Sequence, residues 1–143
     1  MLLASESALK KYNLKPRARI LKTYVCGSDP VMQLTDPIPA VRELFKRTGL
    51  SMADIDLVEV NEAFASVVLA CVKELEIPLD KLNVNGGAIA LGHPLGCSGA
   101  RILATLLINE LERRKLKRGL MALLLNQNPT KELRRNDEKG FKY

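Results

Sequence analysis

Residues 55–75 read IDLVEVNEAFASVVLACVKEL, a short apolar run that passes without a break into a helical pattern. The run 55–60 has the branched side chains and the length of a buried strand. After it, apolar residues recur at spacings of three and four, as on one face of a helix: Phe64, Val67, Val68, Cys71 and Leu75. A strand that leads directly into a helix is the repeating unit of α/β proteins.

Further strands are predicted on both sides of this unit. Residues 17–25 are rich in branched side chains and follow a proline, residues 82–84 begin a short strand, and residues 119–125 form a continuous apolar run. Strands that alternate with helices in this way indicate an α/β fold. We therefore expect a mixed, mainly parallel sheet with helices on its faces.

Two further helices are predicted between these strands. The first runs from Pro39, which suits the first turn of a helix, to Gly49, which suits a C-terminal cap. The second begins near Ser98 and carries apolar residues on one face as far as Leu111. The pattern ends after residue 128, so we expect one domain over 1–128 and a charged, disordered tail over 129–143.

Composition excludes several classes of protein. The chain has 143 residues, 47% of them hydrophobic, and a net charge of +6. No apolar run is long enough to span a bilayer, so we expect no membrane association and a cytoplasmic location. Cys26, Cys71 and Cys97 are widely spaced, and His93 is the single histidine, which argues against a disulfide framework and a metal site. Aromatic residues do not interleave with the basic ones, so we expect no nucleic-acid partner.

A glycine-rich segment follows the predicted strand at 82–84, and residues 83–101 read NVNGGAIALGHPLGCSGAR. Its glycines permit close backbone approach, and Pro94 biases His93 toward an extended conformation. The segment enters a helix near Ser98, where free amides and the helix dipole favour negative charge. A histidine there is suited to stabilising an oxyanion. The residues alone equally allow a simple strand-to-helix crossover in which His93 caps a neighbouring group.

Taken together, two blocks resemble the signature of the thiolase family. They are Asn61-Glu62-Ala63-Phe64 and Gly92-His93-Pro94-Leu95-Gly96-Cys97-Ser98-Gly99. The likeness covers residues 1–125 and includes three upstream motifs: PRARI at 16–20, GSDP at 27–30 and DIDLVE at 54–59. The resemblance implies half of a thiolase fold.

The resemblance also implies an acyl-CoA acyltransferase, which performs thiolysis of a β-ketoacyl-CoA or the reverse Claisen condensation. In the family's pattern, His93 holds the thioester oxygen, and Asn61 positions a water that donates to the same oxygen. Preorganised donors of this kind contribute roughly 3 kcal/mol each. Phe64, Gly92 and Gly96 are expected to line the substrate site, although a helix-face phenylalanine also fits a core. The expected substrate is a coenzyme A thioester, with no separate cofactor and no metal.

The cysteines depart from the family's pattern. The family carries its nucleophilic cysteine in an amino-terminal domain, and none of the three cysteines here matches that setting. Cys97 lies at a predicted helix start, which can lower a thiol pKa, but it belongs to the His-Pro block. A second, acid/base cysteine is expected in a glycine-rich turn, where residues 119–128 read GLMALLLNQN instead. Charged residues then replace an expected apolar strand at 131–137, as truncation or a shifted reading frame would produce.

Because of these departures, the function expected of this chain differs from that of a complete thiolase. The isolated chain is expected to be inactive, with an acyl-CoA as ligand and either a separate thiolase amino-terminal half or a second copy of the chain as partner. A noncatalytic module that binds CoA thioesters is an alternative. A nucleic-acid binder would rest on the net charge alone, and a solvated charged surface explains that charge more simply.

Overall fold

The computed structural model describes residues 1–124. Its elements, in chain order, are α1 (Glu6–Lys11), α2 (Pro37–Thr48), η1 (Met52–Asp54), β1 (Leu57–Val60), α3 (Ala65–Leu75), η2 (Leu79–Lys81), α4 (Ala88–Leu91), α5 (Leu95–Arg101), η3 (Ile102–Ile108), α6 (Asn109–Arg114) and β2 (Gly119–Ala122). The predicted boundary between a domain ending at 128 and a tail from 129 lies outside the described residues.

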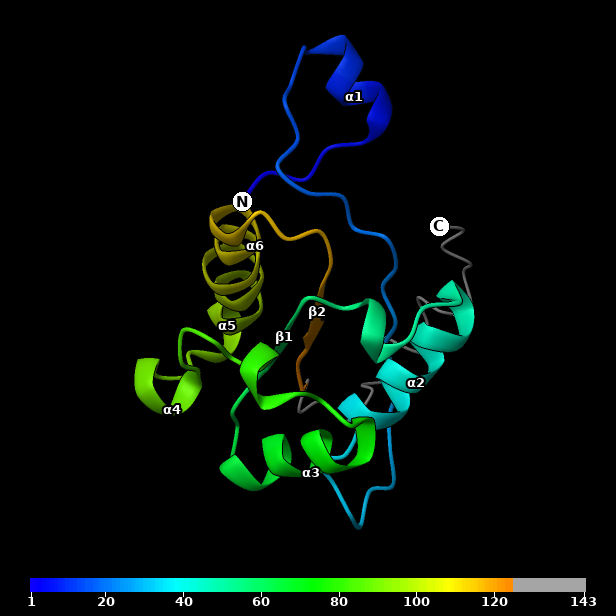
Figure 1. The fold of residues 1–143 in the computed structure, drawn as a ribbon, viewed down its shortest axis with the longest axis vertical. Coiled ribbons are helices and arrows are strands. Elements are labelled where there is room, and N and C mark those ends of the chain that lie inside the picture. The colour runs from blue at the N-terminus through cyan, green and yellow to red at the C-terminus, as the bar shows by residue number, and fades with distance from the viewer. Residues whose placement is uncertain (125–143) are drawn as a thin grey trace.

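The two strands lie side by side at the centre of the molecule and run parallel (Figure 1). Their register pairs Leu57 with Gly119 and continues to Val60 with Ala122. Before the strands begin, a carboxylate oxygen of Asp56 accepts hydrogen bonds from the backbone amides of residues 117 and 118. The predicted strand at 82–84 forms only isolated bridges, Leu82 with Val58 and Val84 with Gly86. The parallel arrangement expected from the sequence is confirmed for the described strands.

All four residues of β1 are buried, because helices cover both faces of the strand pair. Val58 and Val60 pack into a core with apolar side chains of α2, α3 and β2. Leu57 and Glu59 alternate with them and therefore point to the opposite face, which η3 covers. The strand pair is thus a thin layer between α2 and α3 on one side and the α5–α6 region on the other (Figure 1).

The helices around this layer largely follow the predicted patterns. Helix α2 has Pro37 in its first turn and ends at Gly49, whose φ of 70° is the left-handed conformation of a C-terminal cap. Helix α3 begins directly after the Asn61–Phe64 block and ends at Glu76, also left-handed at φ 52°. Helix α1, which the sequence analysis did not identify, is capped by the hydroxyl of Ser5.

The second predicted helix begins one turn earlier than expected. It starts at Leu95, not near Ser98, and continues through α5, η3 and α6 to Arg114. The middle section, η3, has the wider π-helical bonding, a rare form that is frequent at functional sites. Because the helix starts early, Ser98 lies inside it and is 2% exposed. Ser98 therefore lies within the helix and is buried, and it does not lie at the start of the helix as the sequence predicted.

The prediction of a strand at 17–25 is wrong for the described structure. The segment is extended (Figure 1) but makes no backbone hydrogen bond to another described segment. Ile20, Leu21 and Val25 are each more than half exposed. A cavity of about 90 Å³ separates residues 24–26 from residues 121–123, with α2 as its floor. Branched side chains favour an extended backbone, but a strand also needs a neighbour within hydrogen-bonding distance.

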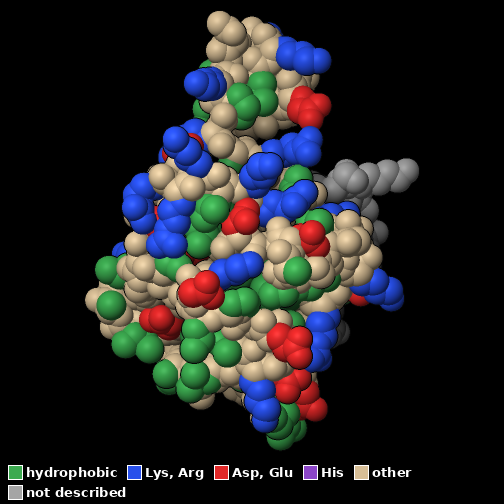
Figure 2. Space-filling model, viewed as in Figure 1, with side chains coloured by type: hydrophobic (Ala, Val, Ile, Leu, Met, Phe, Trp, Pro, Cys, Tyr) green, Lys and Arg blue, Asp and Glu red, His purple; other side chains and the backbone are tan. Residues whose placement is uncertain are grey.

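Charged and apolar side chains separate on the surface. On the face in Figure 2, lysines and arginines gather over the upper half, whereas hydrophobic side chains are frequent over the region of α3 and α4 below. The exposed large apolar residues of that region are Phe64, Leu69, Leu79, Ile89, Leu91 and Leu95. No helix within residues 1–124 is long and apolar enough to cross a membrane.

Candidate active site

The site begins at the end of β1, where Asn61 extends the strand pairing by one residue. Its backbone amide donates to the carbonyl of Ala122 at 3.0 Å. The residue is 2% exposed, and its side-chain Oδ1 is a buried atom without a hydrogen-bond partner among residues 1–124. Buried amide oxygens are nearly always paired, so an unpaired one indicates a place where water or a ligand binds.

His93 lies beside Asn61 although the two are far apart in the sequence. Nε2 of His93 is 3.4 Å from Nδ2 of Asn61, and Nδ1 is 2.7 Å from the hydroxyl of Ser98. The imidazole is half-buried and comes from the short connection between α4 and α5. The two residues that the sequence analysis singled out are therefore adjacent. Their catalytic roles stay predictions.

Gly92 sets the backbone direction just before the histidine. Its φ of 83° and ψ of 161° fall in a region that is essentially restricted to glycine. A Cβ would meet no atom within 4 Å, so the requirement for glycine comes from the backbone and not from crowding. This conformation turns the chain out of α4 and brings His93 back toward β1.

We expect Gly92→Ala to lower the free energy of unfolding by on the order of 1 kcal/mol, because alanine is strained at this φ and ψ. Chemical denaturation measures this loss. The ring signals of His93, the only histidine, should shift in the NMR spectrum as the loop relaxes. Gly96→Ala is the matched control, since Gly96 has open space around it and no positive φ. Equal behaviour of the two variants would contradict the assignment of strain to Gly92.

Glu62 anchors the glycine-rich segment, a role that the sequence analysis missed. Its carboxylate accepts hydrogen bonds from the amide of Ile89 at 2.9 Å and from Nδ2 of Asn83 at 3.1 Å. Asn83 in turn bonds both backbone groups of Val60. A Cβ on Gly87 would lie 2.3 Å from the carboxyl carbon of Glu62, so this close approach needs a glycine. The available signal was the position of Glu62 inside the Asn61–Phe64 block.

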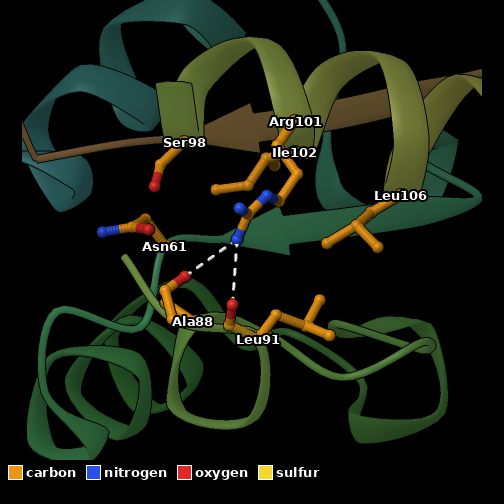
Figure 3. Close-up of a pocket in the computed structure, with 9 residues that line it drawn as sticks. Asn61, Ala88, Leu91, Ser98, Arg101, Ile102 and Leu106 are labelled. Carbon is orange, nitrogen blue, oxygen red and sulfur yellow. Dashed lines mark hydrogen bonds between the residues drawn. The ribbon is translucent and has the colours of Figure 1, made fainter. Parts of the chain in front are cut away.

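Arg101 holds the same loop from the other side. Its guanidinium donates to the carbonyl of Leu91 at 3.1 Å and to that of Gly92 at 3.0 Å (Figure 3). Figure 3 shows this side chain reaching from the helix to α4, with Ser98 and Asn61 close by. Together these residues border a small cavity of about 10 Å³ that is also lined by Gly87, Ala88, Gly92, Ile102 and Leu106. A cavity of this size holds about one water molecule.

Two of the predicted substrate-binding residues, Phe64 and Gly96, lie outside the lining of the small cavity. Phe64 is 60% exposed and precedes α3, so its placement on the buried face of that helix is wrong. Its φ and ψ are extended, because the chain has not yet entered the helix. Gly96 lies in the first turn of α5 with open space around it. Neither residue lines the small cavity beside Asn61.

Two of the three cysteines lie where a thiol is disfavoured as a nucleophile. Burial raises the pKa of the Cys71 thiol to about 11, so this thiol stays protonated. Burial and the nearby Asp36 carboxylate also raise the pKa of Cys26. Cys97 is exposed on α5. No group of three potential metal-ligating side chains occurs within the described part of the chain.

Glu59 is a second charged residue that the sequence analysis did not single out. It lies two residues before Asn61 on β1 and is 2% exposed. Burial, and then the neighbouring carboxylates of Glu62 and Glu110, raise its pKa to about 7. Glu110 itself is paired with Arg113 and a second arginine on α6, and the hydrogen bonds to Arg113 and then Asn85 lower its pKa.

Comparison with known proteins gives one family. The family described as "Thiolase, C-terminal domain" matches residues 14–128. A 3-ketoacyl-CoA thiolase of Klebsiella pneumoniae is 50% identical over 87% of this chain and 33% of that relative. The steroid 3-ketoacyl-CoA thiolase FadA6 of Mycobacterium tuberculosis is 53% identical over 86% of this chain and 30% of that relative.

Solved structures agree with this result. Human mitochondrial 3-ketoacyl-CoA thiolase in complex with CoA has a TM-score of 0.81 and 51% identity, over 85% of this chain and 31% of that one. The acetyl-CoA acetyltransferase of Bacillus anthracis has a TM-score of 0.80 and 45% identity, over 85% of this chain and 30% of that one. The chain spans about a third of the length of these relatives. The chain therefore belongs to the thiolase family and carries its C-terminal domain.

Proposed function

We propose that this chain provides the histidine and asparagine of a thiolase-type acyltransferase site, where Asn61 and His93 together bind the oxygen of a coenzyme A thioester. The observation that carries the proposal is the 3.4 Å contact between Nδ2 of Asn61 and Nε2 of His93. The unpaired, buried Oδ1 of Asn61 supports a bound water at the same place. In this arrangement the water and a protonated His93 donate to the oxygen on which negative charge develops.

Several features support acyl-CoA as the ligand. One structural relative is described in complex with CoA, and the relatives are named as 3-ketoacyl-CoA thiolases or as an acetyl-CoA acetyltransferase. The side chains of Phe64, Ile89 and Leu95 are apolar and exposed, which suits contact with an acyl chain. No separate cofactor takes part in the proposed reaction. The three free cysteines support a reducing, cytoplasmic location.

We also propose that catalysis requires a thiolase amino-terminal half in addition to residues 1–124. The thiols of Cys26 and Cys71 are held protonated, and the family's nucleophile belongs to a part of the fold that residues 1–124 do not contain. Phe64, Ile89 and Leu95 are each at least 60% exposed, which leaves three large apolar side chains available to a partner. A thiolase amino-terminal half would cover them, which favours this function over a noncatalytic CoA-binding module.

The test of the oxygen site is an NMR titration of the full chain with acetyl-CoA. His93 is the only histidine, so its ring signals are identified without assignment. We expect a saturable shift of these signals with acetyl-CoA and a smaller one with coenzyme A that lacks the acyl group. Asn61→Ala should weaken the response. Asn109→Ala should not, because that amide lies on α6 and contacts Arg17. Ring signals of His93 that do not shift when acetyl-CoA is added would refute the proposal.

An activity assay separates the two candidate functions. The chain alone should not cleave acetoacetyl-CoA. Mixed with the part of the Klebsiella relative that precedes the matched region, it should support thiolysis, and His93→Ala should abolish that activity. Acetyl-CoA binding without any activity in the mixture would favour the noncatalytic binding module.

A further inference from the structure

The hydroxyl of Ser98 makes a close contact with the imidazole of His93. Oγ of Ser98 is 2.7 Å from Nδ1 of His93 and 3.1 Å from the carbonyl oxygen of Pro94, one helical turn back. Ser98 is 2% exposed, so water does not compete for these bonds. The 2.7 Å distance is within the usual range for an N–H···O bond, and the 3.1 Å distance is slightly longer than the usual O–H···O bond.

The chemistry of the groups determines where the protons lie. The Pro94 carbonyl can only accept, so it takes the hydroxyl proton of Ser98. The hydroxyl oxygen then presents lone pairs to Nδ1 of His93, which must carry a proton for the second bond to form. If the hydroxyl donated to Nδ1 instead, only one of the two bonds would be made. The arrangement with more hydrogen bonds in a buried site is the stable one.

The contact on the far side of the imidazole agrees with this assignment. Nδ2 of Asn61 can only donate, and it faces Nε2 of His93 at 3.4 Å. With the amide in this orientation, the contact is a hydrogen bond only when Nε2 is unprotonated in the neutral ring. Three contacts then form one chain of donors and acceptors, from the Asn61 amide through the ring and the Ser98 hydroxyl to the Pro94 carbonyl.

We propose that Ser98 is a positioning residue that fixes His93 in the tautomer with the proton on Nδ1. In this tautomer Nε2 faces Asn61 with a free lone pair. The consequence for the reaction rests on the function proposed above: the ring must first take up a proton at Nε2 before it can donate to a thioester oxygen. The tautomer itself is a property of the unliganded chain and does not depend on that function.

The fold allows Ser98 to act on the ring without moving the loop. Arg101 independently fixes the backbone before His93 through the carbonyls of Leu91 and Gly92. The Pro94 carbonyl also accepts the amide of Cys97 at 2.9 Å, so the start of the helix does not depend on the Ser98 hydroxyl. Removal of this hydroxyl should therefore release the ring while the loop keeps its path.

The test is the ¹⁵N NMR spectrum of the full chain, labelled at histidine and recorded without ligand at an alkaline pH where the ring is neutral. Protonated and unprotonated ring nitrogens have widely separated shifts, and the single histidine makes the result unambiguous. We expect Nδ1 to carry the proton in the wild-type chain. In Ser98→Ala, the population of the Nε2-protonated tautomer relative to the Nδ1-protonated one should rise by on the order of tenfold. This is the expected effect of losing one hydrogen bond.

Two further variants separate positioning from general stability. Ser98→Thr keeps the hydroxyl and should keep the wild-type tautomer. Ser7→Ala removes a hydroxyl from the exposed helix α1 and should change nothing. A wild-type ring protonated at Nε2 would overturn the proposal even if Ser98→Ala failed to fold, and so would a folded Ser98→Ala chain that keeps the wild-type ratio. Because no ligand is present, failure here is distinct from failure of the acetyl-CoA titration.

Discussion

Between pH 5 and pH 8 the wild-type chain should lose about 2.5 kcal/mol of stability, and Glu59→Gln should remove most of this loss. The reason is the position of Glu59 on β1, where it is 2% exposed. Burial, and then repulsion from Glu62 and Glu110, raise its pKa to about 7 from an ordinary value of 4.5. Glutamine has nearly the same shape and no charge to bury.

The sign of the effect follows from where the proton binds more tightly. In the folded chain Glu59 keeps its proton up to a pH of about 7, whereas in the unfolded chain it loses the proton near 4.5. The folded state is therefore fully favoured below pH 4.5 and loses this contribution as the pH rises through 7. Each unit of pKa difference corresponds to about 1.4 kcal/mol. Glu110, whose pKa is lowered, acts in the opposite direction and only at acid pH.

Urea unfolding at several pH values measures this dependence. The wild-type chain, Glu59→Gln and the control Glu6→Gln should be compared. Glu6 lies on the exposed helix α1, so its replacement should leave the slope of the wild-type chain unchanged. A decline of stability with pH that persists in Glu59→Gln would show that another group causes it.

The sequence predicted well those features that depend on local patterns. The passage from β1 to α3 followed from an apolar run and a helical spacing, and Gly49 followed from the preference of glycine for left-handed caps. The parallel direction of β1 and β2 followed from the alternation of strands and helices along the chain. These features need only neighbouring residues, so one sequence is sufficient to predict them.

The segment 17–25 shows why other features could not be predicted. Its side chains favour an extended backbone, and the backbone is extended. Whether it forms a strand depends on what lies beside it, and a cavity separates it from residues 121–123. Pairing is a long-range property that the local pattern does not contain.

The same distinction applies to the site. His93 and Asn61 were singled out through two blocks that resemble a known family, and the structure places them together. The supporting roles of Glu62, Ser98 and Arg101 were missed, because each depends on a side-chain hydrogen bond that the residue pattern does not reveal. Ser98 was expected at a helix start, and only the earlier start at Leu95 brings its hydroxyl back to the Pro94 carbonyl.

Gly119→Val should lower the free energy of unfolding by about 2 kcal/mol, although valine is the better strand residue. Gly119 begins β2, and a Cβ built there would lie 2.6 to 2.9 Å from three carbons of Leu107. Leu107 is 4% exposed within η3, so it cannot move into solvent. Overpacking a fixed neighbour costs about 1–3 kcal/mol, whereas the gain in strand propensity is at most about 1 kcal/mol.

Gly27→Val is the matched control for this prediction. A Cβ at Gly27 meets nothing within 4 Å, and the residue has no positive φ. Chemical denaturation should therefore show a clear loss for Gly119→Val and a small change for Gly27→Val. If Gly119→Val were as stable as the wild type, Leu107 would have an alternative position. The contact between η3 and β2, which holds the long helix and Ser98 against the strands, would then be looser than the structure shows.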